Sequence, residues 1–181
     1  MKHLFFFISL GAMSAPLQAE MPDSSAAQQE QQRRLFIQVE HQISSASPSQ
    51  VERWLTELQD YPLQPYLKQR WLQRRMSHHD DIVLFLEQHQ GSPLDWPLRR
   101  PWLMSLAKGQ QAARFLEHFP GSNDPELNCI AIQQQLKVRP ATIAEIWQQT
   151  ESLWTVGKSQ PKACDPLFSQ WRNAGQLTTE A

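Results

Sequence analysis

The chain has 181 residues and a formal net charge of −1 at pH 7, a length that suits one domain or slightly more. Its nearly balanced charge excludes the strongly basic surface that attracts nucleic acids and anionic lipids, so we expect neither as a partner. Only six glycines among many Gln and Leu residues favour helices, because long unbranched side chains lose little rotamer freedom there. The composition therefore predicts an all-α chain.

The first residues have the pattern of a secretory signal peptide. Lys2 and His3 form a short basic region, and an apolar run from Leu4 to Met13 follows it. This run is too short to span a bilayer, which needs ~20 residues, and no later segment is a better candidate. Small residues near its end fit cleavage after Ala19. We therefore expect an exported chain with a signal peptide at residues 1–19 and no transmembrane segment.

The mature chain begins with a polar stretch that leads into helices. Residues 20–32 are small and polar and are predicted to form a flexible leader. Within it, near residue 27, a helix with apolar residues at 3.6-residue spacing is predicted to begin and to run to residue 43. Ser47 and Pro48 form an N-cap and first-turn pair. They predict a second helix over residues 48–58.

The next helices are separated by turn residues. Pro65 is predicted to start a third helix, and Ser77 is predicted to cap a fourth, with Asp80 three residues later in a capping-box arrangement. Gly91 is a natural stop for the fourth helix. Three prolines then cluster, so residues 92–100 are predicted to be extended or broken rather than helical.

Five more helices are predicted along the rest of the chain. Three of them start at a proline or an Asp-Pro pair, and most end at glycine or turn residues. The predicted spans are 101–108, 110–118, 125–136, 141–153, and from Asp165 to the stop at Gly175.

Nine helices with short connections predict antiparallel helical hairpins. Because consecutive pairs have similar length and bury mainly against their neighbours, we expect an α-solenoid, or superhelix, over residues 33–181. A compact orthogonal helical bundle is the alternative. Residues 178–181 have the form of an N-cap and a first helical turn, after which the chain stops. We therefore expect a truncated C-terminus, since one turn cannot sustain a helix.

The two cysteines, Cys129 and Cys164, both lie in the mature part of the chain. In an oxidising exported compartment an isolated pair is most simply a disulfide. The loop that it would close, about 35 residues long, predicts a stabilisation of roughly 3 to 4 kcal/mol. A catalytic thiol is the alternative, although no local pattern supplies a partner histidine.

One cluster has metal-ligand residue types, the run from His78 to Asp81. Neighbouring residues on a helix point about 100° apart and converge poorly on one ion. No Gly-rich phosphate loop and no Cys-pair zinc pattern is present. We therefore predict a polar helix N-terminus at this cluster, and no metal or cofactor.

The seven tryptophans and two arginine pairs are the remaining candidates for binding. Most Trp residues fall on apolar helix faces, where core packing is expected, but Trp96 lies in the proline-rich stretch and is a candidate for an exposed stacking role. The pairs Arg74-Arg75 and Arg99-Arg100 are predicted to be solvated surface. Contact with an anionic glycan or peptide is the alternative for them.

Two segments resemble the soluble lytic murein transglycosylases, periplasmic enzymes of Gram-negative bacteria. The run from Asp60 to Leu67 reads DYPLQPYL, and the stretch from Leu153 to Leu177 contains LWTVGKSQPKACDPLFSQWRNAG. Both are similar to runs in the N-terminal region of that family, and the likeness extends loosely over residues 33–178. The resemblance implies a superhelical array of helices that forms a U-shaped part of a larger ring, in the periplasm.

The resemblance also implies a pairing and a substrate. Cys129 matches the Asn-Cys position of the family and Cys164 its Ala-Cys-Asp position, so the two are expected to pair. Enzymes of this kind cleave peptidoglycan between N-acetylmuramic acid and N-acetylglucosamine, leave a 1,6-anhydro end, and need no cofactor. Peptidoglycan strands, and other cell-wall proteins of the same compartment, are the expected partners of the whole enzyme.

The catalytic glutamate of that family lies in a separate lysozyme-like domain, in a Glu-Ser motif followed by Gly-Leu-Met-Gln. Glu151 and Ser152 offer only the first part of this pattern. We therefore name no catalytic residue and expect a superhelical scaffold region without the catalytic domain, inactive alone. The alternative is a stand-alone periplasmic helical scaffold that binds a protein or a glycan strand.

Overall fold

The computed structural model describes residues 24–138 and 143–177. Within these ranges it contains nine α-helices, the short 3-10 helix η2 and no strand, which confirms the all-α prediction. The predicted signal peptide and the predicted helix start at residue 178 lie outside the described residues. The elements are α1 (Ser24–Glu40), α2 (Pro48–Glu57), α3 (Gln64–Leu72), α4 (His79–Gln88), α5 (Asp95–Lys108), α6 (Ala112–His118), α7 (Pro125–Val138), α8 (Ile143–Trp154), η2 (Lys162–Cys164) and α9 (Asp165–Asn173).

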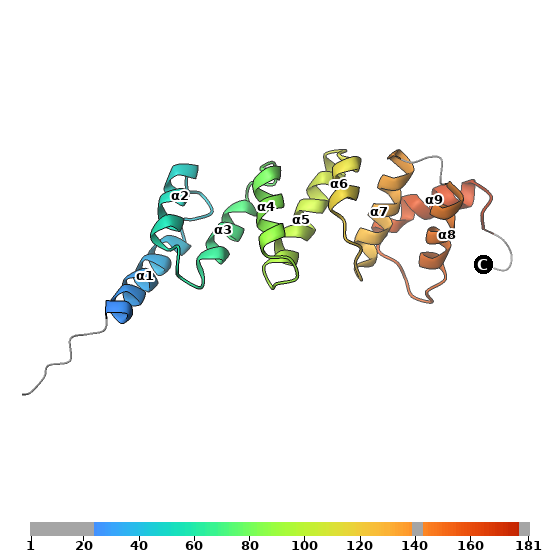
Figure 1. Ribbon diagram of the computed structural model, residues 1–181. Helices are drawn as coiled ribbons and strands as arrows, with labels where there is room; N and C mark the ends of the chain where they lie inside the picture. The colour runs from blue at the N-terminus through green and yellow to red at the C-terminus, as the bar shows by residue number, and fades with distance from the viewer. Residues whose placement is uncertain (1–23, 139–142, 178–181) are drawn as a thin grey trace, which may run out of the picture.

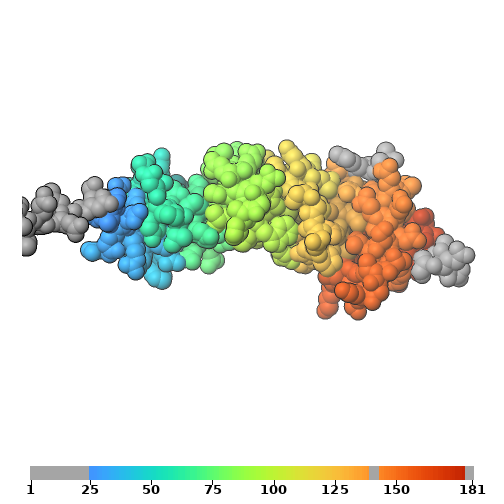
Figure 2. Space-filling model, turned by 60° about the horizontal axis from the view of Figure 1, so that its bottom comes forward, coloured from blue at the N-terminus to red at the C-terminus, as the bar shows by residue number. Residues whose placement is uncertain are grey.

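The helices form an elongated stack rather than a ball. Successive helices alternate in direction, so the loops after α2, α4, α6 and α8 lie along the lower edge of the molecule in Figure 1, and those after α3 and α5 along the upper edge. Most packing joins helices that are neighbours in sequence, with added contacts of α5 with α7 and of α7 with α9. The colours in Figure 2 accordingly follow one another along the rod in chain order. This arrangement confirms the predicted solenoid of helical hairpins and excludes the compact bundle.

Two apolar cores run through the stack. The larger extends from Phe36 in α1 to Ala131 in α7, and the smaller surrounds the two cysteines at the C-terminal end. Among the described residues, no helix combines the length and the apolar character needed to cross a membrane. The buried residues of the smaller core are Cys129, Ile132, Ile146, Cys164, Leu167 and Phe168.

Local capping explains two helix starts as the sequence predicts. The Ser47 hydroxyl accepts a hydrogen bond from the Gln50 backbone N–H at 3.3 Å, and the Gln50 side chain accepts one from the Ser47 N–H at 2.9 Å. At α7, Asp124 Oδ1 accepts hydrogen bonds from the backbone N–H groups of Glu126 and Leu127. Both caps satisfy amide groups that the first turn leaves without helical partners.

The first helix and the fourth begin elsewhere than predicted. Helix α1 starts at Ser24, so the second half of the expected leader, residues 24–32, is helical. Helix α4 has His78 at its N-cap, without a side-chain capping bond, and the predicted cap at Ser77 is wrong. The His78 ring instead lies 3.3 Å from Asp81 Oδ2, one turn further on.

The prediction that residues 92–100 are not helical is also wrong, because α5 begins at Asp95. Pro97 stands in the first turn, where a missing N–H costs no helical bond. Pro101 lies inside the helix and cannot donate to the carbonyl four residues earlier, that of Pro97. The side-chain amide of Gln73 donates to that carbonyl at 3.1 Å. A neighbouring hairpin thus supplies the bond that the proline removes.

Side chains that reach backbone carbonyls of another hairpin recur along the stack. Gln69 Nε2 donates a hydrogen bond to the Leu94 carbonyl at 2.7 Å, and Trp71 Nε1 donates one to the Ala46 carbonyl at 3.2 Å. Gln133 Nε2 donates to the carbonyl of Ala163 at 2.6 Å. These bonds join residues 25 to 30 positions apart, about one hairpin along the chain. They fix how far each hairpin slides along the next, while the apolar cores supply most of the stabilisation.

Candidate functional site

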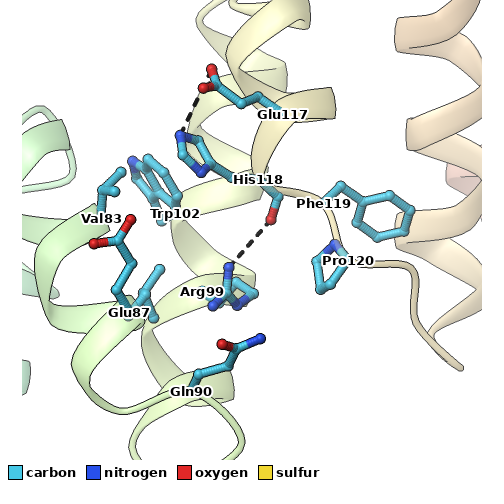
Figure 3. A pocket seen from close by; sticks show the side chains of 10 residues that line it. Val83, Glu87, Gln90, Arg99, Trp102, Glu117, His118, Phe119 and Pro120 are labelled. Carbon is cyan, nitrogen blue, oxygen red and sulfur yellow. Dashed lines mark hydrogen bonds and ion pairs between the residues drawn. The ribbon is translucent and has the colours of Figure 1, made fainter.

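A groove lies where α4 and α6 flank α5. Its inner part, about 220 Å³, is lined by Val83 and Glu87 of α4, Trp102 of α5, and Glu117 and His118 of α6 (Figure 3). A second part of about 400 Å³ shares four of these residues and adds His79, Asp80 and Arg114 among others. The groove therefore combines an indole floor with acidic, basic and imidazole side chains at its rim.

Trp102 forms the floor of this groove and is fully buried. Its Nε1 donates a hydrogen bond of 3.1 Å to His79 Nδ1, and the His118 ring centroid lies 5.1 Å from its own. Burial, and after it the positive charge of Arg114, lowers the pKa of His79 below its usual 6.5, while Asp80 acts in the opposite direction. His79 is therefore a neutral hydrogen-bond acceptor for a buried indole, a structural role.

The lowered pKa of His79 predicts how stability depends on pH. Between the folded-state pKa and 6.5 the unfolded chain binds the proton that folded His79 refuses, so the free energy of unfolding falls as the pH drops through this window. Urea unfolding at about pH 7.5 and about pH 5.5 measures the effect. His79→Gln keeps an oxygen acceptor for Trp102 without titrating, so it should reduce the pH dependence. An equal dependence in the variant and the wild type contradicts this role.

The residues from His78 to Asp81 do not gather around one point. His78 contacts Asp81, whereas His79 turns toward Trp102 in the neighbouring hairpin. No group of three or more potential metal ligands lies together in the described part of the chain.

Three of the four paired arginines are bound by the protein, so their prediction as solvated surface is wrong. Arg99 donates to Asp95 at 2.6 Å and to the His118 carbonyl at 3.3 Å, and the Arg99 and Asp95 side chains are each 13% exposed. Arg75 donates to the carbonyls of Ser44 and Ala46 and covers the Trp71 ring at 4.4 Å. Arg74 is exposed.

Arg100 pairs with two carboxylates of a neighbouring hairpin. Its guanidinium donates to Asp124 at 2.8 Å and to Glu126 at 2.6 Å, and the bond to Asp124 raises the pKa of Arg100. Burial raises the pKa of Asp124, but the bonds from Arg100 and from the backbone N–H groups of Leu127 and Glu126 outweigh it, so the net direction is down. Asp124 is thus an ionised carboxylate that caps α7 and pairs with Arg100 of α5.

Most tryptophans lie in the core and Trp96 is partly exposed, as predicted, but the partial exposure of Trp154 was not predicted. Trp54, Trp71, Trp102 and Trp171 are buried. Trp96 and Trp154 are each 37% exposed. Trp154 lies against Phe168 and Trp171, whereas Trp96 lines a second pocket of about 380 Å³ that adjoins the groove at Arg99 and Pro120. Trp96 stands in the first turn of α5 rather than in a loop.

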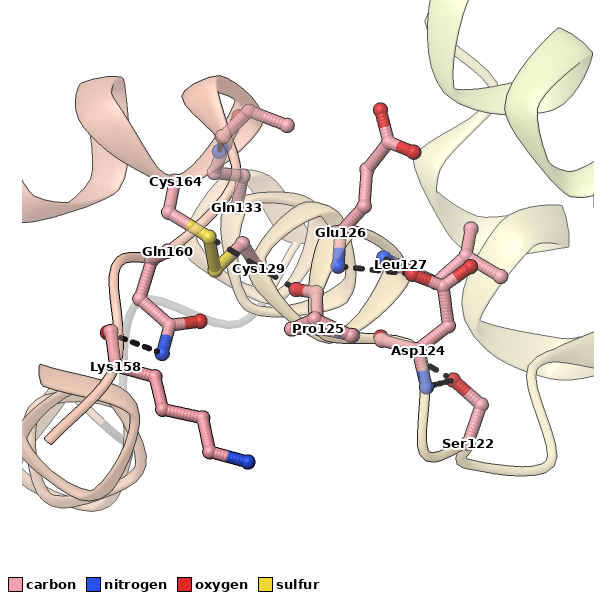
Figure 4. Close-up of a disulfide and its surroundings, with 11 residues drawn as sticks. Ser122, Asp124, Pro125, Glu126, Leu127, Cys129, Gln133, Lys158, Gln160 and Cys164 are labelled. Atoms are coloured by element: carbon pink, nitrogen blue, oxygen red, sulfur yellow. Dashed lines mark hydrogen bonds between the residues drawn. A yellow bond between two sulfur atoms is a disulfide. The ribbon is translucent and has the colours of Figure 1, made fainter. Parts of the chain in front are cut away.

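The two cysteines are joined in a disulfide that links α7 to η2 (Figure 4). Both are fully buried, their Cα atoms lie 5.1 Å apart, and 35 positions separate them in the sequence. With both sulfurs bonded to each other, neither is a thiolate nucleophile. The pair holds the α8–α9 hairpin against α7.

Glu151 and Ser152 lie on the exposed surface of α8. The Ser152 hydroxyl donates to the carbonyl of Gln148, one turn earlier in the same helix. A carboxyl that protonates a glycosidic oxygen needs a shielded environment that keeps its proton on at neutral pH. The surface position of Glu151 does not provide one.

The sequence is similar to a group of known proteins. No protein-family model matches the chain. It is 28% identical over 152 residues to the soluble lytic murein transglycosylase of Escherichia coli strain K12, and 29% identical to that of Salmonella typhimurium. Each alignment covers 81% of this chain and 23% of the relative.

Solved structures agree with the sequence relatives. An inactive mutant of the lytic transglycosylase Slt from Pseudomonas aeruginosa superposes with a TM-score of 0.71 at 36% identity, over 82% of this chain and 24% of that one. The 70-kDa soluble lytic transglycosylase in complex with bulgecin A gives 0.70 at 27% identity, over 83% and 24%. The chain spans about a quarter of the length of these relatives. Sequence and fold together make this chain a homologue of the soluble lytic murein transglycosylases over about a quarter of their length.

Proposed function

We propose that this chain is the N-terminal superhelical scaffold region of a periplasmic soluble lytic murein transglycosylase, and that its own residues do not break glycosidic bonds. The observation that carries the proposal is the match of the whole solenoid to about a quarter of such enzymes. In the whole enzyme, the scaffold would hold the peptidoglycan strand or the cleaving domain. That domain would cleave between N-acetylmuramic acid and N-acetylglucosamine and leave 1,6-anhydro ends.

The state of the shielded carboxylates supports the absence of cleavage. Glycosidic cleavage requires a carboxylic acid with a raised pKa. The carboxylates of Asp95 and Asp124 are among the more shielded, and each is paired with an arginine. The net pKa of Asp124 is lowered, which is the wrong direction for a general acid. Neither residue is suited to protonate a leaving group.

The disulfide supports export. Disulfides persist in oxidising compartments, and the buried pair Cys129 and Cys164 ties together the smaller of the two cores. The predicted signal peptide at residues 1–19 points to the same compartment. Amino-terminal sequencing of protein secreted to the periplasm of a Gram-negative host checks both, with Glu20 expected as the first residue.

Incubating the purified chain with peptidoglycan sacculi tests the proposal directly. We expect no 1,6-anhydro muropeptides above the buffer level by mass spectrometry, while the whole Escherichia coli enzyme, as positive control, releases them. Clear release by the chain alone would show that chemistry resides in it and overturn the proposal. Reading the coding region past codon 181 separates a region of a larger enzyme from the alternative, a stand-alone scaffold.

A further inference from the structure

The pocket beside Trp96 is built by two loops that follow successive hairpins. The loop between α4 and α5 contributes Gly91 and Ser92, and the loop between α6 and α7 contributes Pro120, Ser122 and Asn123 among its lining residues. Both loops turn with a glycine at positive φ, 71° at Gly91 and 79° at Gly121. The pocket, about 380 Å³, therefore lies between neighbouring repeats on one edge of the rod.

The charges in this pocket cancel within the protein. Arg99 donates to both carboxylate oxygens of Asp95, at 2.6 and 3.3 Å, and Asp95 also accepts from the backbone N–H of Gly91 at 3.1 Å. No other charged side chain lines the pocket. A charged ligand would find no unpaired partner there, so the pocket suits a neutral one.

The remaining lining combines a flat apolar surface with small polar groups. The Trp96 indole is 37% exposed, and Pro120 is exposed beside it. Asn123 is exposed, and its side-chain amide makes no hydrogen bond within the described ranges. The Ser92 hydroxyl accepts from the Leu94 N–H at 3.2 Å and keeps its own proton available to donate. Such a surface matches a ligand with one apolar face and hydrogen-bonding edges.

We propose that this pocket binds one pyranose ring of a neutral, N-acetylated glycan, with the sugar face against Trp96 and its polar edge toward Asn123 and Ser92. A pyranose presents axial C–H groups on one face and hydroxyl and acetamido groups around its rim, which fits an indole beside an amide and a hydroxyl. The choice of a glycan rests on the proposed function, since a peptidoglycan strand consists of such rings. Through this pocket the scaffold would bind the glycan strand directly.

Binding of a β-1,4-linked N-acetylglucosamine tetramer to the purified, disulfide-bonded chain tests the proposal. Isothermal titration should give a millimolar dissociation constant, and Trp96→Ala should weaken it at least about fivefold. Trp154→Ala is the matched control, because that indole is equally exposed, at 37%, but lines no part of the pocket. We expect the control to bind as the wild type does.

Asn123→Ala provides a second variant if Trp96→Ala fails to fold, and it should weaken binding about threefold through the lost hydrogen bonds. Absence of tetramer binding by the wild type, or equal loss in Trp96→Ala and Trp154→Ala, overturns the assignment. So does preference for a neutral proline-rich peptide at the same site. These outcomes are independent of the cleavage assay, because the pocket can fail to bind sugar in a scaffold that still lacks turnover.

Discussion

Reduction of the disulfide between Cys129 and Cys164 is expected to lower the free energy of unfolding by about 3 to 4 kcal/mol. The reason is that the bond closes a loop with a sequence separation of 35, and so restricts the unfolded chain. Urea unfolding followed by circular dichroism, with and without a reductant, measures the loss. The Cys129→Ser, Cys164→Ser double variant should match the reduced protein and should not respond to reductant.

The loss should be concentrated at the C-terminal end. Because the stack packs mainly between neighbours, α8 and α9 should gain amide hydrogen exchange on reduction, while α3 and α4 keep their protection. Uniform loss of protection along the rod would contradict this localisation. An unchanged unfolding midpoint would contradict the stabilising role of the bond itself.

Replacing Trp102 by alanine is expected to cost about 3 to 5 kcal/mol of stability. The side chain is fully buried, and its removal leaves a cavity between α4, α5 and α6 and deprives His79 of its donor. The loss should appear in urea unfolding as a lower midpoint with the circular dichroism of the folded state retained below it.

Trp96→Ala is the matched control for that experiment, since it removes the same side chain from the same helix at a partly exposed position. It should cost about 1 kcal/mol or less. Equal destabilisation by the two variants would mean that burial of Trp102 is not what holds α4 and α6 on α5. Trp102→Phe should fall between them, because it keeps an aromatic ring and loses the N–H donor.

Local signals in the sequence predicted most helices but could not reveal contacts between hairpins. The Ser47-Pro48 and Asp124-Pro125 pairs predicted two starts because capping depends on residues within one turn. The start of α5 was missed because the carbonyl left by Pro101 is satisfied by Gln73, 24 positions earlier. Propensity arguments contain no information about such a partner.

The candidate site shows the same division. The exposure of Trp96 follows from the surrounding prolines, and the disulfide between Cys129 and Cys164 from their being an isolated pair in an exported chain. The pairing of Arg99 with Asp95 and of Arg100 with Asp124 was missed, although the four-residue spacing of the first pair on one helix could have indicated it. The pockets lie between hairpins, so their linings follow from the stacking geometry alone.

The side-chain bonds from Gln69, Gln73 and Gln133 to carbonyls of another hairpin have a mechanical consequence. Each joint holds a few polar bonds worth about 1 kcal/mol apiece beside a sliding apolar contact. We therefore expect a pull along the axis to be shared as small tilts at many joints, so that the rod lengthens before any single hairpin opens. Such compliance would let the two ends of the rod move relative to one another while every hairpin stays folded.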